Sequence, residues 1–354
     1  MTVAPGTPPA RPGISVPFDG IALHDHRQWF ARLRELGYTD LWSSEVDGAD
    51  GFTPLALAAA WEPTMNLGVA ITPAYTRGPA LLAQSLAAMA DAAPGRFFVG
   101  LGASSKAIVA DWNGIAFDRQ FARVRDTLRF LRLAFSGEKV RQEYETFHVG
   151  GFRLSRLPEQ LPPIYLAALR PGMLRLAGRE ADGVILNWLA ADDVATSVAE
   201  VTAAAEGEHR EVAARIFVIV CEDADLARTV GRRMIAAYLN VPAYAEFHRW
   251  LGRGPALTPM WEAWAAGDRK GALAAIPNSV VDELVVHGSV EECRAHVQRY
   301  VDNGITVPAP MVIPLGVDLA DAVAGLSPAA ATAAAAPATG GTRGTRATGG
   351  TRAG

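Results

Sequence analysis

The chain has 354 residues, half of them apolar and one fifth charged, with a formal net charge of −4. This length suits one large α/β domain with additions. The acidic balance argues against a nucleic-acid partner, and no apolar run is long enough to span a membrane. The only cysteines are Cys221 and Cys293, and no basic and apolar leader is visible, so a reduced, cytoplasmic protein is expected.

Both ends are predicted to be disordered. Residues 1–12 are rich in Pro, Thr and Ala, and residues 327–354 form a low-complexity stretch with a repeated Gly-Thr-Arg. Neither segment has enough apolar content to offset the entropy lost on ordering. We therefore expect residues 13–326 to form the folded domain and both tails to be solvated.

Strands and helices alternate between these tails. Short apolar runs, typical of parallel strands buried on both faces, occur at residues 13–16, 40–44, 66–71, 97–101, 163–168, 183–188, 215–220 and 306–313. Helical sequence follows every run except the last. Eight such units predict an α/β fold, the (β/α)8 TIM barrel.

Two helices are marked clearly, and two insertions decorate the predicted barrel. Apolar residues recur every three or four positions from Phe117 to Phe135. Ser289 begins another helix as its N-cap, with Glu292 as the partner in a capping box. A hairpin is predicted over residues 137–154, turning at Gly150-Gly151, before the fifth strand. A helical insertion is predicted over residues 239–282, between the seventh and eighth strands.

The turn after the fourth strand, Gly100-x-Gly102-x-x-Ser105, comes close to a dinucleotide-binding fingerprint. A Rossmann turn opens a helix at once within the first strand–helix unit. Here the strand is the fourth, and a loop through Asp111 to Gly114 precedes the helix. We therefore interpret the turn as the carboxyl end of a barrel strand.

Small residues at this turn leave backbone N–H groups free to approach an anion, at Gly102, Ala103 and Ser104. A second such place is Ala168-Leu169-Arg170 with Gly172, where a strand ends and a helix begins. Two phosphate-binding places on neighbouring strands suit one phosphorylated cofactor. A tight turn that needs glycine for backbone reasons alone is the alternative at Gly102.

Glu45 ends the second strand and shares a strand face with Ser43. If that face is the barrel lumen, Glu45 is a candidate catalytic acid and Ser43 lines a substrate pocket. A salt bridge at the barrel mouth is the alternative for Glu45, as it is for Arg77. Candidate pocket walls at strand ends and in the following loops are Asp111, Trp112 and Trp188, with ordinary packing as the alternative for the aromatic residues.

No metal site is predicted. His24-Asp25-His26 follows the first strand, as in metal-dependent hydrolase barrels, but those also need histidines at strands five and six and an aspartate at strand eight. The strands predicted here supply none of these. No Ser-His-Asp or Cys-His arrangement is visible at matching strand ends either.

Several segments together resemble one family, the luciferase-like superfamily, and within it the branch of oxidoreductases that depend on the deazaflavin coenzyme F420. They are "RFFVGLGASSKAIVADWNG", "LGVAITPAYTRGPALLAQSLAAM", "PPIYLAALRPGMLRLAGREADGVILNWL" and "YLNVPAYAEFHRWLG". The resemblance covers roughly residues 14–318.

The resemblance implies a TIM barrel that transfers a hydride between the deazaflavin C5 and a small-molecule substrate. It also implies a cis peptide at Ala70-Ile71, followed by Thr72, behind the ring, and a polar cofactor contact at Asn187. The alternatives are an FMN-dependent monooxygenase and a flavin-binding barrel without turnover. Relatives often dimerise, so the resemblance includes a homodimer among its expectations.

The sequence departs from the sugar-phosphate dehydrogenases of this superfamily. They carry a glutamate in the turn after strand four and a catalytic histidine after strand two. Ala103 and Val46 stand at those positions here. That particular chemistry is therefore not expected.

Overall fold

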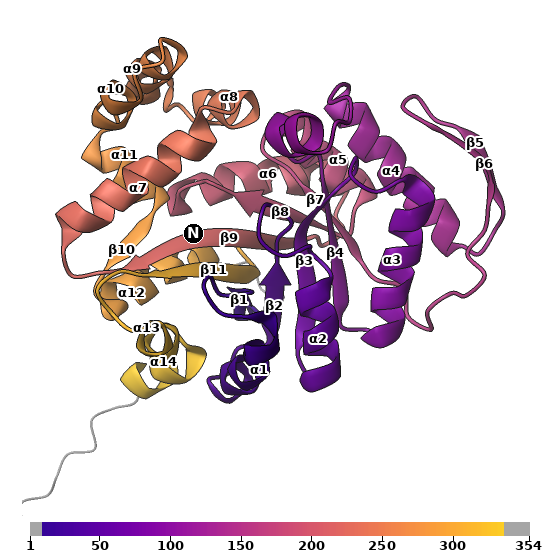
Figure 1. The fold of residues 1–354 in the computed structure, drawn as a ribbon, viewed down its shortest axis with the longest axis horizontal. Coiled ribbons are helices and arrows are strands. Elements are labelled where there is room, and N and C mark those ends of the chain that lie inside the picture. Colours follow the sequence, from indigo (N-terminus) through magenta and orange to yellow (C-terminus); the bar gives the residue numbers. More distant parts are fainter. Residues whose placement is uncertain (1–8, 336–354) are drawn as a thin grey trace, which may run out of the picture.

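The computed structural model describes residues 9–335, in which parallel strands curl into a barrel surrounded by helices (Figure 1). The sheet runs in the order β1-β2-β3-β4-β7-β8-β9, with β11 on the other side of β9. These strands are β1 (Gly13–Ser15), β2 (Asp40–Ser43), β3 (Asn66–Pro73), β4 (Phe97–Gly102), β7 (Ile164–Ala167), β8 (Gly183–Asn187), β9 (Glu211–Val220) and β11 (Val307–Pro314). The predicted TIM barrel and all eight of its strands are confirmed.

The first and last barrel strands come together to close the sheet almost completely. The backbone N–H of Arg11 donates to the carbonyl of Thr306 at 2.8 Å. The hydroxyl of Ser15 donates to the carbonyl of Ala309 at 3.2 Å. A nearly closed sheet leaves few unpaired strand edges.

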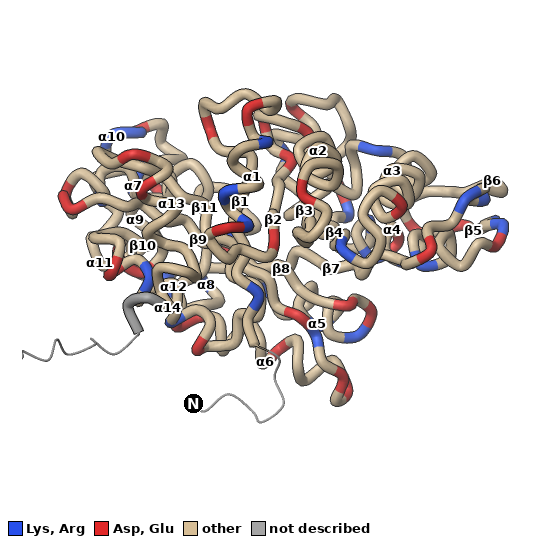
Figure 2. Tube along the Cα trace, turned by 90° about the horizontal axis from the view of Figure 1, so that it is seen from below, with Lys and Arg blue, Asp and Glu red and all other residues tan. Residues whose placement is uncertain are grey.

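Helices cover the outside of the barrel. They are α1 (His26–Glu35), α2 (Thr53–Trp61), α3 (Pro79–Ala92), α4 (Gln120–Phe135), α5 (Pro171–Glu180), α6 (Val194–Ala204), α12 (Val290–Asp302) and α13 (Leu319–Gly325). Ser289 and Glu292 form the predicted capping box at the start of α12. Basic and acidic residues are interspersed along these outer elements (Figure 2). No helix within residues 9–335 has the length and apolar character needed to cross a membrane.

The predicted helical insertion follows β9 and packs to one side of the barrel (Figure 1). After β9 comes α7 (Ala224–Leu239), and the insertion predicted over residues 239–282 then consists of α8 (Pro242–Trp250), α9 (Gly254–Ala265), α10 (Arg269–Ala274) and α11 (Asn278–Leu284). They bury a second apolar core against Phe217 and Ile219 of β9. A short strand that the sequence did not predict, β10 (Val286–Gly288), then pairs with the end of β9.

The predicted hairpin exists, but its turn was placed wrongly. Its strands are β5 (Val140–Glu143) and β6 (His148–Phe152), so the turn lies between them and not at Gly150-Gly151. The backbone N–H of Tyr144 donates to the carbonyl of Phe147, and their rings lie 4.8 Å apart. Gly151 instead sits within β6, opposite a register shift between Val140 and Arg141, with φ of 122°. Gly151 therefore belongs to a β-bulge and not to a turn; both structures favour a residue with positive φ.

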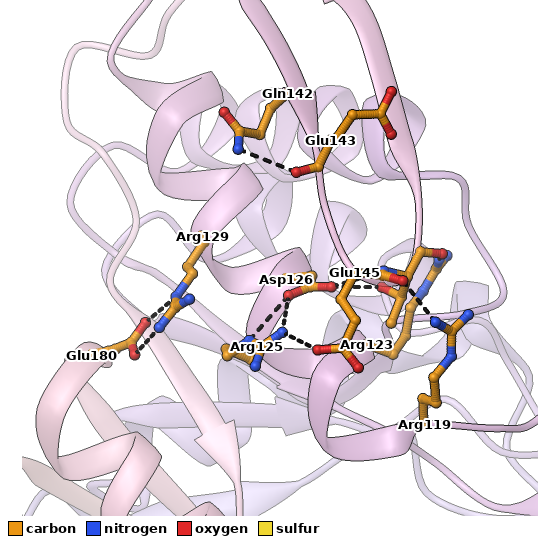
Figure 3. A network of polar contacts seen from close by, with 10 residues as sticks. Arg119, Arg123, Arg125, Asp126, Arg129, Gln142, Glu143, Glu145 and Glu180 are labelled. Atoms are coloured by element: carbon orange, nitrogen blue, oxygen red, sulfur yellow. Dashed lines mark hydrogen bonds and ion pairs between the residues drawn. The ribbon is translucent and has the colours of Figure 1, made fainter.

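A polar network fastens this hairpin to α4 (Figure 3). The guanidinium of Arg125 donates to Asp126 at 2.7 Å and to Glu145 at 2.8 Å. The buried carboxylate of Asp126 also accepts from the backbone N–H and the hydroxyl of Thr146, each at 3.0 Å. Because Asp126 has several donors around it, its buried charge is compensated.

Both predicted tail boundaries differ from the structure. Arg11 lies within the expected N-terminal tail, yet it pairs with Asp40 at 3.1 Å. Residues 328–335 form a further helix, α14 (Pro328–Ala335), and Ser327 is buried. The backbone N–H of Ala329 donates to the carbonyl of Leu36 at 3.2 Å. Local composition missed these contacts because both partners lie far away in sequence; the rest of the predicted tails, residues 1–8 and 336–354, lies outside the described residues.

We expect α14 to contribute to stability. Chains that end after Leu326 and after Ala335 should differ in melting temperature, because only the longer one keeps the contacts of Ser327 and Ala329. A loss of ~1–2 kcal/mol corresponds to a few degrees in a domain of this size. Differential scanning calorimetry of both truncations checks this, and equal melting temperatures would show that the helix adds nothing.

Candidate functional site

Aromatic rings fill the lower part of the barrel lumen. Trp42 of β2 lies 6.4 Å from Phe98 and 6.2 Å from Tyr165, measured between ring centroids. A Cβ added at Gly68 of β3 would lie 2.4 Å from the Trp42 ring, so only glycine leaves room for it. The lower lumen is therefore a packed core.

A small cavity of about 10 Å³ lies in the lumen, with room for about one water molecule. It is lined by residues from several strands, among them Ser15, Trp42, Ser44, Ala70, Ile185 and Arg215. Ala70 and Arg215 come from strands on opposite sides of the barrel. Because the barrel strands are parallel, their carboxyl ends all lie at one end of the barrel, which we call the mouth.

The predicted irregularity of β3 is confirmed. The peptide bond between Ala70 and Ile71 is cis. The pairing of β3 with β4 shifts register between Val69 and Thr72. Ala70 presents only a methyl group to the lumen cavity, whereas the hydroxyl of the buried Thr72 accepts from Arg77 at 3.3 Å.

On β2, the ring of Trp42 fills the lumen, and Ser43 also lines the small cavity, as expected for a pocket residue. The Ser43 hydroxyl, however, is engaged within the chain. The hydroxyl of Ser43 donates to the carbonyl of Gly51 at 2.6 Å and holds the loop after β2. Both faces of a barrel strand are buried, so alternation alone could not decide between them.

Glu45 is held in an ion pair at the mouth. Both of its carboxylate oxygens lie 2.7 Å from the same guanidinium nitrogen of Arg77. The backbone N–H of Gly51 donates to Glu45 at 3.3 Å, and the Arg77 guanidinium lies 4.6 Å from the centre of the Phe52 ring. Glu45 therefore has partners within the chain, which favours the alternative of a salt bridge over that of a catalytic acid.

The two predicted phosphate-binding places differ in what their glycines do. A Cβ at Gly102 would lie 3.0 Å from both Ala167 and Ile71, so this glycine is needed for close packing of β4. A Cβ at Gly172, in the first turn of α5, would meet nothing closer than Phe121 at 4.0 Å. The space over Gly172 is open to a ligand, whereas that at Gly102 is filled by the protein.

Backbone N–H groups around these glycines have no acceptor among the described residues. They belong to Ser104, Leu169 and Gly172. Ser104 has φ of 65°, which turns the chain sharply after β4. Arg170 is exposed beside them. Unsatisfied N–H groups at a helix start and a tight turn favour an anion.

A group of buried polar atoms lies at the end of β8. The side-chain nitrogen of Asn187 donates to the hydroxyl of Tyr244 at 3.1 Å, while its oxygen has no partner in the described chain. Trp188 was expected to form a pocket wall, but it is 1 % exposed and its ring lies 4.2 Å from that of Phe217. It is a core residue, which corrects that prediction.

The remaining predicted pocket residues lie on the outside of the mouth. Asp111 pairs with Lys106 at 2.7 Å on an exposed turn, and the neighbouring Trp112 is 57 % exposed. They belong to a π-helical segment, Ala107–Trp112. They do not touch the lumen cavity, so the fold does not bring them together with Ala70.

The His24-Asp25-His26 segment has a structural role. The buried ring of His26 accepts from the backbone N–H of Phe18 at 2.9 Å and lies 3.0 Å from the carbonyl of Ala22. His24 is exposed and lies 3.4 Å from Asp25. Residues 9–335 contain no group of three His, Cys, Asp or Glu side chains that could hold a metal ion.

Sequence reasoning missed two residues of the site, Arg215 and Tyr244. Arg215 interrupts the apolar run Glu211–Val220 at a position that alternates with Ala213 and Phe217. A charged residue inside a buried strand is unusual, and that was the available signal. Tyr244 comes from α8, which only the tertiary fold brings to the end of β8.

His248 of α8 is fully buried, and neither ring nitrogen has a hydrogen-bond partner in the described chain. Burial and, to a smaller extent, the positive charge of Arg253 lower the pKa of His248 to about 3, although the backbone of Trp188 acts in the opposite direction. Arg253 itself pairs with Asp193 at 2.7 Å. The imidazole is therefore neutral in the folded protein.

Comparison with known proteins shows the family to which the chain belongs. The model of the luciferase-like monooxygenase family matches residues 2–307. The chain is 27% identical over 300 residues to a 5,10-methylenetetrahydromethanopterin reductase of Methanolobus tindarius, covering 82% of this chain and 90% of the relative. It is 28% identical over 271 residues to an F420-dependent glucose-6-phosphate dehydrogenase of Rhodococcus erythropolis, covering 72% of this chain and 76% of the relative.

The fold matches a solved structure over nearly its whole length. The coenzyme F420-dependent tetrahydromethanopterin reductase of Methanopyrus kandleri superposes with a TM-score of 0.71. The match covers 90% of this chain and 97% of that chain, at 19% identity. At this identity the likeness shows the fold alone.

We expect His248 to make stability depend on pH. Its pKa is lower in the folded protein than in the unfolded chain, so the unfolded chain binds the proton first. Stability should be full above pH 6.5 and fall as the pH drops toward 3, by about 2 kcal/mol at pH 5. In His248→Leu this loss should be absent. Urea unfolding at pH 7.5 and 5 measures it, with exposed His209→Leu as control; an unchanged slope in His248→Leu would contradict it.

Proposed function

Because the chain belongs to the luciferase-like monooxygenase family, we propose that it is an oxidoreductase that uses coenzyme F420 to exchange a hydride with a small organic substrate. Relatives along most of its length are named as reductases and F420-dependent dehydrogenases. The observation that carries the proposal is the open first turn of α5, where Gly172 leaves space beside N–H groups that lack acceptors. That turn follows β7, at the same mouth as Ala70.

The residues at the mouth fit a flat ring with a phosphorylated side chain. The methyl group of Ala70 leaves room for a ring against β3, where Ile71 and Thr72 continue the irregular strand. Asn187 offers a buried oxygen without a partner. We assign the phosphate to the two turns around Gly102, Ala103 and Ser104 and around Ala168, Leu169, Arg170 and Gly172.

When bound, the deazaflavin supplies the hydride donor or acceptor, and the protein supplies binding, orientation and dryness. Trp42 fills the lumen beside Ala70 and would close the site beneath a bound ring, which limits the access of bulk water from that side. The ion pair of Glu45 and Arg77 fixes the loop after β2 against Thr72. We therefore propose that Glu45 is a positioning residue of the mouth.

The alternative cofactor is FMN, because the family is described by monooxygenases. Titration of the purified protein with each cofactor separates the two proposals. Binding of F420, read from its absorbance in the violet, supports the proposed function. Binding of FMN alone, with absorbance in the blue, would replace it with a monooxygenase.

The phosphate assignment predicts the effect of a side chain at Gly172. Gly172→Val should weaken F420 binding by about tenfold or more, or about 1.4 kcal/mol, because the valine occupies the approach to the N–H groups. The fold should persist, since the nearest atom to a Cβ there is a ring carbon of Phe121 at 4.0 Å, an ordinary van der Waals contact. The control is Gly254→Val, at the first turn of α9 and outside the barrel. Normal F420 affinity in Gly172→Val would refute this assignment.

The positioning role predicts energetic coupling between Glu45 and Arg77. Both side chains are mostly buried, so removing either one leaves the other without its partner. Glu45→Gln and Arg77→Met should each destabilise the protein, and the double variant should lose less than their sum, by about 1 kcal/mol. Denaturant unfolding of the four proteins measures this coupling without any substrate. Additive losses, together with unchanged F420 affinity, would argue against the positioning role.

A further inference from the structure

Arg215 is a charged residue inside the barrel without a counter-ion. Its Nε is buried and has no hydrogen-bond partner, and no carboxylate in residues 9–335 forms an ion pair with it. One terminal nitrogen lies 2.7 Å from the sulfur of Met311, and the guanidinium lies 5.1 Å from the centre of the Phe217 ring. A thioether is a weak acceptor. Two other arginines of the barrel, Arg11 and Arg77, are each paired with a carboxylate.

An unpaired charge that is partly removed from water is costly unless a ligand supplies the missing acceptor. Beyond its contact with the sulfur of Met311, the Arg215 guanidinium keeps N–H groups without an acceptor. A guanidinium binds a carboxylate or a phosphate through two parallel hydrogen bonds. The local chemistry therefore selects an oxyanion.

The position of Arg215 indicates that this oxyanion belongs to the substrate and not to the cofactor. Going round the barrel from β3, the strands are β4, β7, β8 and then β9, so β9 stands across the lumen from β3. Ala70 and Arg215 line the same small cavity from these two sides, beneath the mouth at which the ring and the substrate would lie. With the ring against β3, the group that reaches Arg215 belongs to the molecule on the other side of the ring. The phosphate-binding turns follow β4 and β7, on a different part of the mouth.

A second donor lies on the same side. The hydroxyl of Tyr244 accepts from Asn187 at 3.1 Å, which leaves its own proton free to donate. Burial raises the pKa of Tyr244 to about 12, and the charge of Arg215 acts on it in the opposite direction. The hydroxyl therefore stays protonated and within the field of Arg215.

From these observations we propose that Arg215, assisted by Tyr244, is the specificity-determining residue of the site and binds an oxyanion group of the substrate. The substrate class is then a small organic anion, such as a carboxylate, that lies between the ring and β9. The placing of the substrate beside the ring rests on the proposed function. The preference of Arg215 for an anion is independent of it.

The test compares two probes of the same shape and different charge. Full-length protein loaded with F420 is titrated with benzoate and with benzamide in a calorimeter. Wild type should bind benzoate about tenfold more tightly or better. Arg215→Met should remove this preference, and Arg215→Lys should keep part of it, because lysine keeps the charge without the fork. Equal binding of the two probes by wild type would overturn the inference.

Further arms separate the other outcomes. If inorganic phosphate competes with benzoate, the site accepts a phosphate-type oxyanion. If phosphate does not compete, the site is specific for a carboxylate. Arg215→Met should keep F420 affinity within about twofold; a tenfold loss would place Arg215 in the cofactor site and overturn the inference. If wild type does not bind F420, the proposed function fails, and the benzoate titration of cofactor-free protein still decides the role of Arg215.

Stability supplies the control for misfolding. Removing an unpaired charge should not lower the melting temperature, so Arg215→Met is expected to be at least as stable as wild type. Arg232→Met, at an arginine of α7 that donates to the carbonyl of Ile276, should leave benzoate binding unchanged. An equal loss of benzoate binding in both variants would contradict a specific role for Arg215.

Discussion

The rest of the structure depends on how the barrel lumen is filled. Trp42, Phe98 and Tyr165 occupy its lower part, and glycines make room for them. A Cβ at Gly183 would lie 2.8 Å from the Tyr165 ring, and one at Gly100 would lie 2.1 Å from the carbonyl oxygen of Val69. Large rings opposite absent side chains satisfy close packing in a lumen of fixed width. Small residues such as Ser15, Ala70 and Ala309 line the small cavity that remains beside these rings.

Charged residues take different roles at the two ends of the lumen. At the amino-terminal end, Arg11 pairs with Asp40 and Glu211, and the hydroxyl of Tyr165 also donates to Glu211. These ions compensate one another and close the barrel floor. Toward the mouth, Arg215 has only a sulfur and an aromatic face as neighbours. A compensated cluster stabilises the closed end, whereas an uncompensated charge creates affinity for a ligand.

The additions to the barrel are attached by polar contacts with long sequence separation. Asp126 (Figure 3) holds the hairpin through Thr146. Arg253 joins the insertion to Asp193, just before α6. Through these contacts α8 brings Tyr244 to Asn187. The insertion therefore contributes directly to the polar surroundings of the site, and its contribution depends on its docking against the barrel.

The sequence alone determined the barrel, because each strand and helix has a local signal: apolar runs for strands, and Ser289 with Glu292 for a helix start. The resemblance of "LGVAITP" to one family also located the irregular bond at Ala70. Only the tertiary structure decided that the Trp42 ring fills the lumen while the Ser43 hydroxyl bonds to the loop after β2, since both faces of a barrel strand are buried and alternation fits either. It also decided that Glu45 is paired while Arg215 is not, because a charge is compensated or left free by neighbours that are distant in sequence.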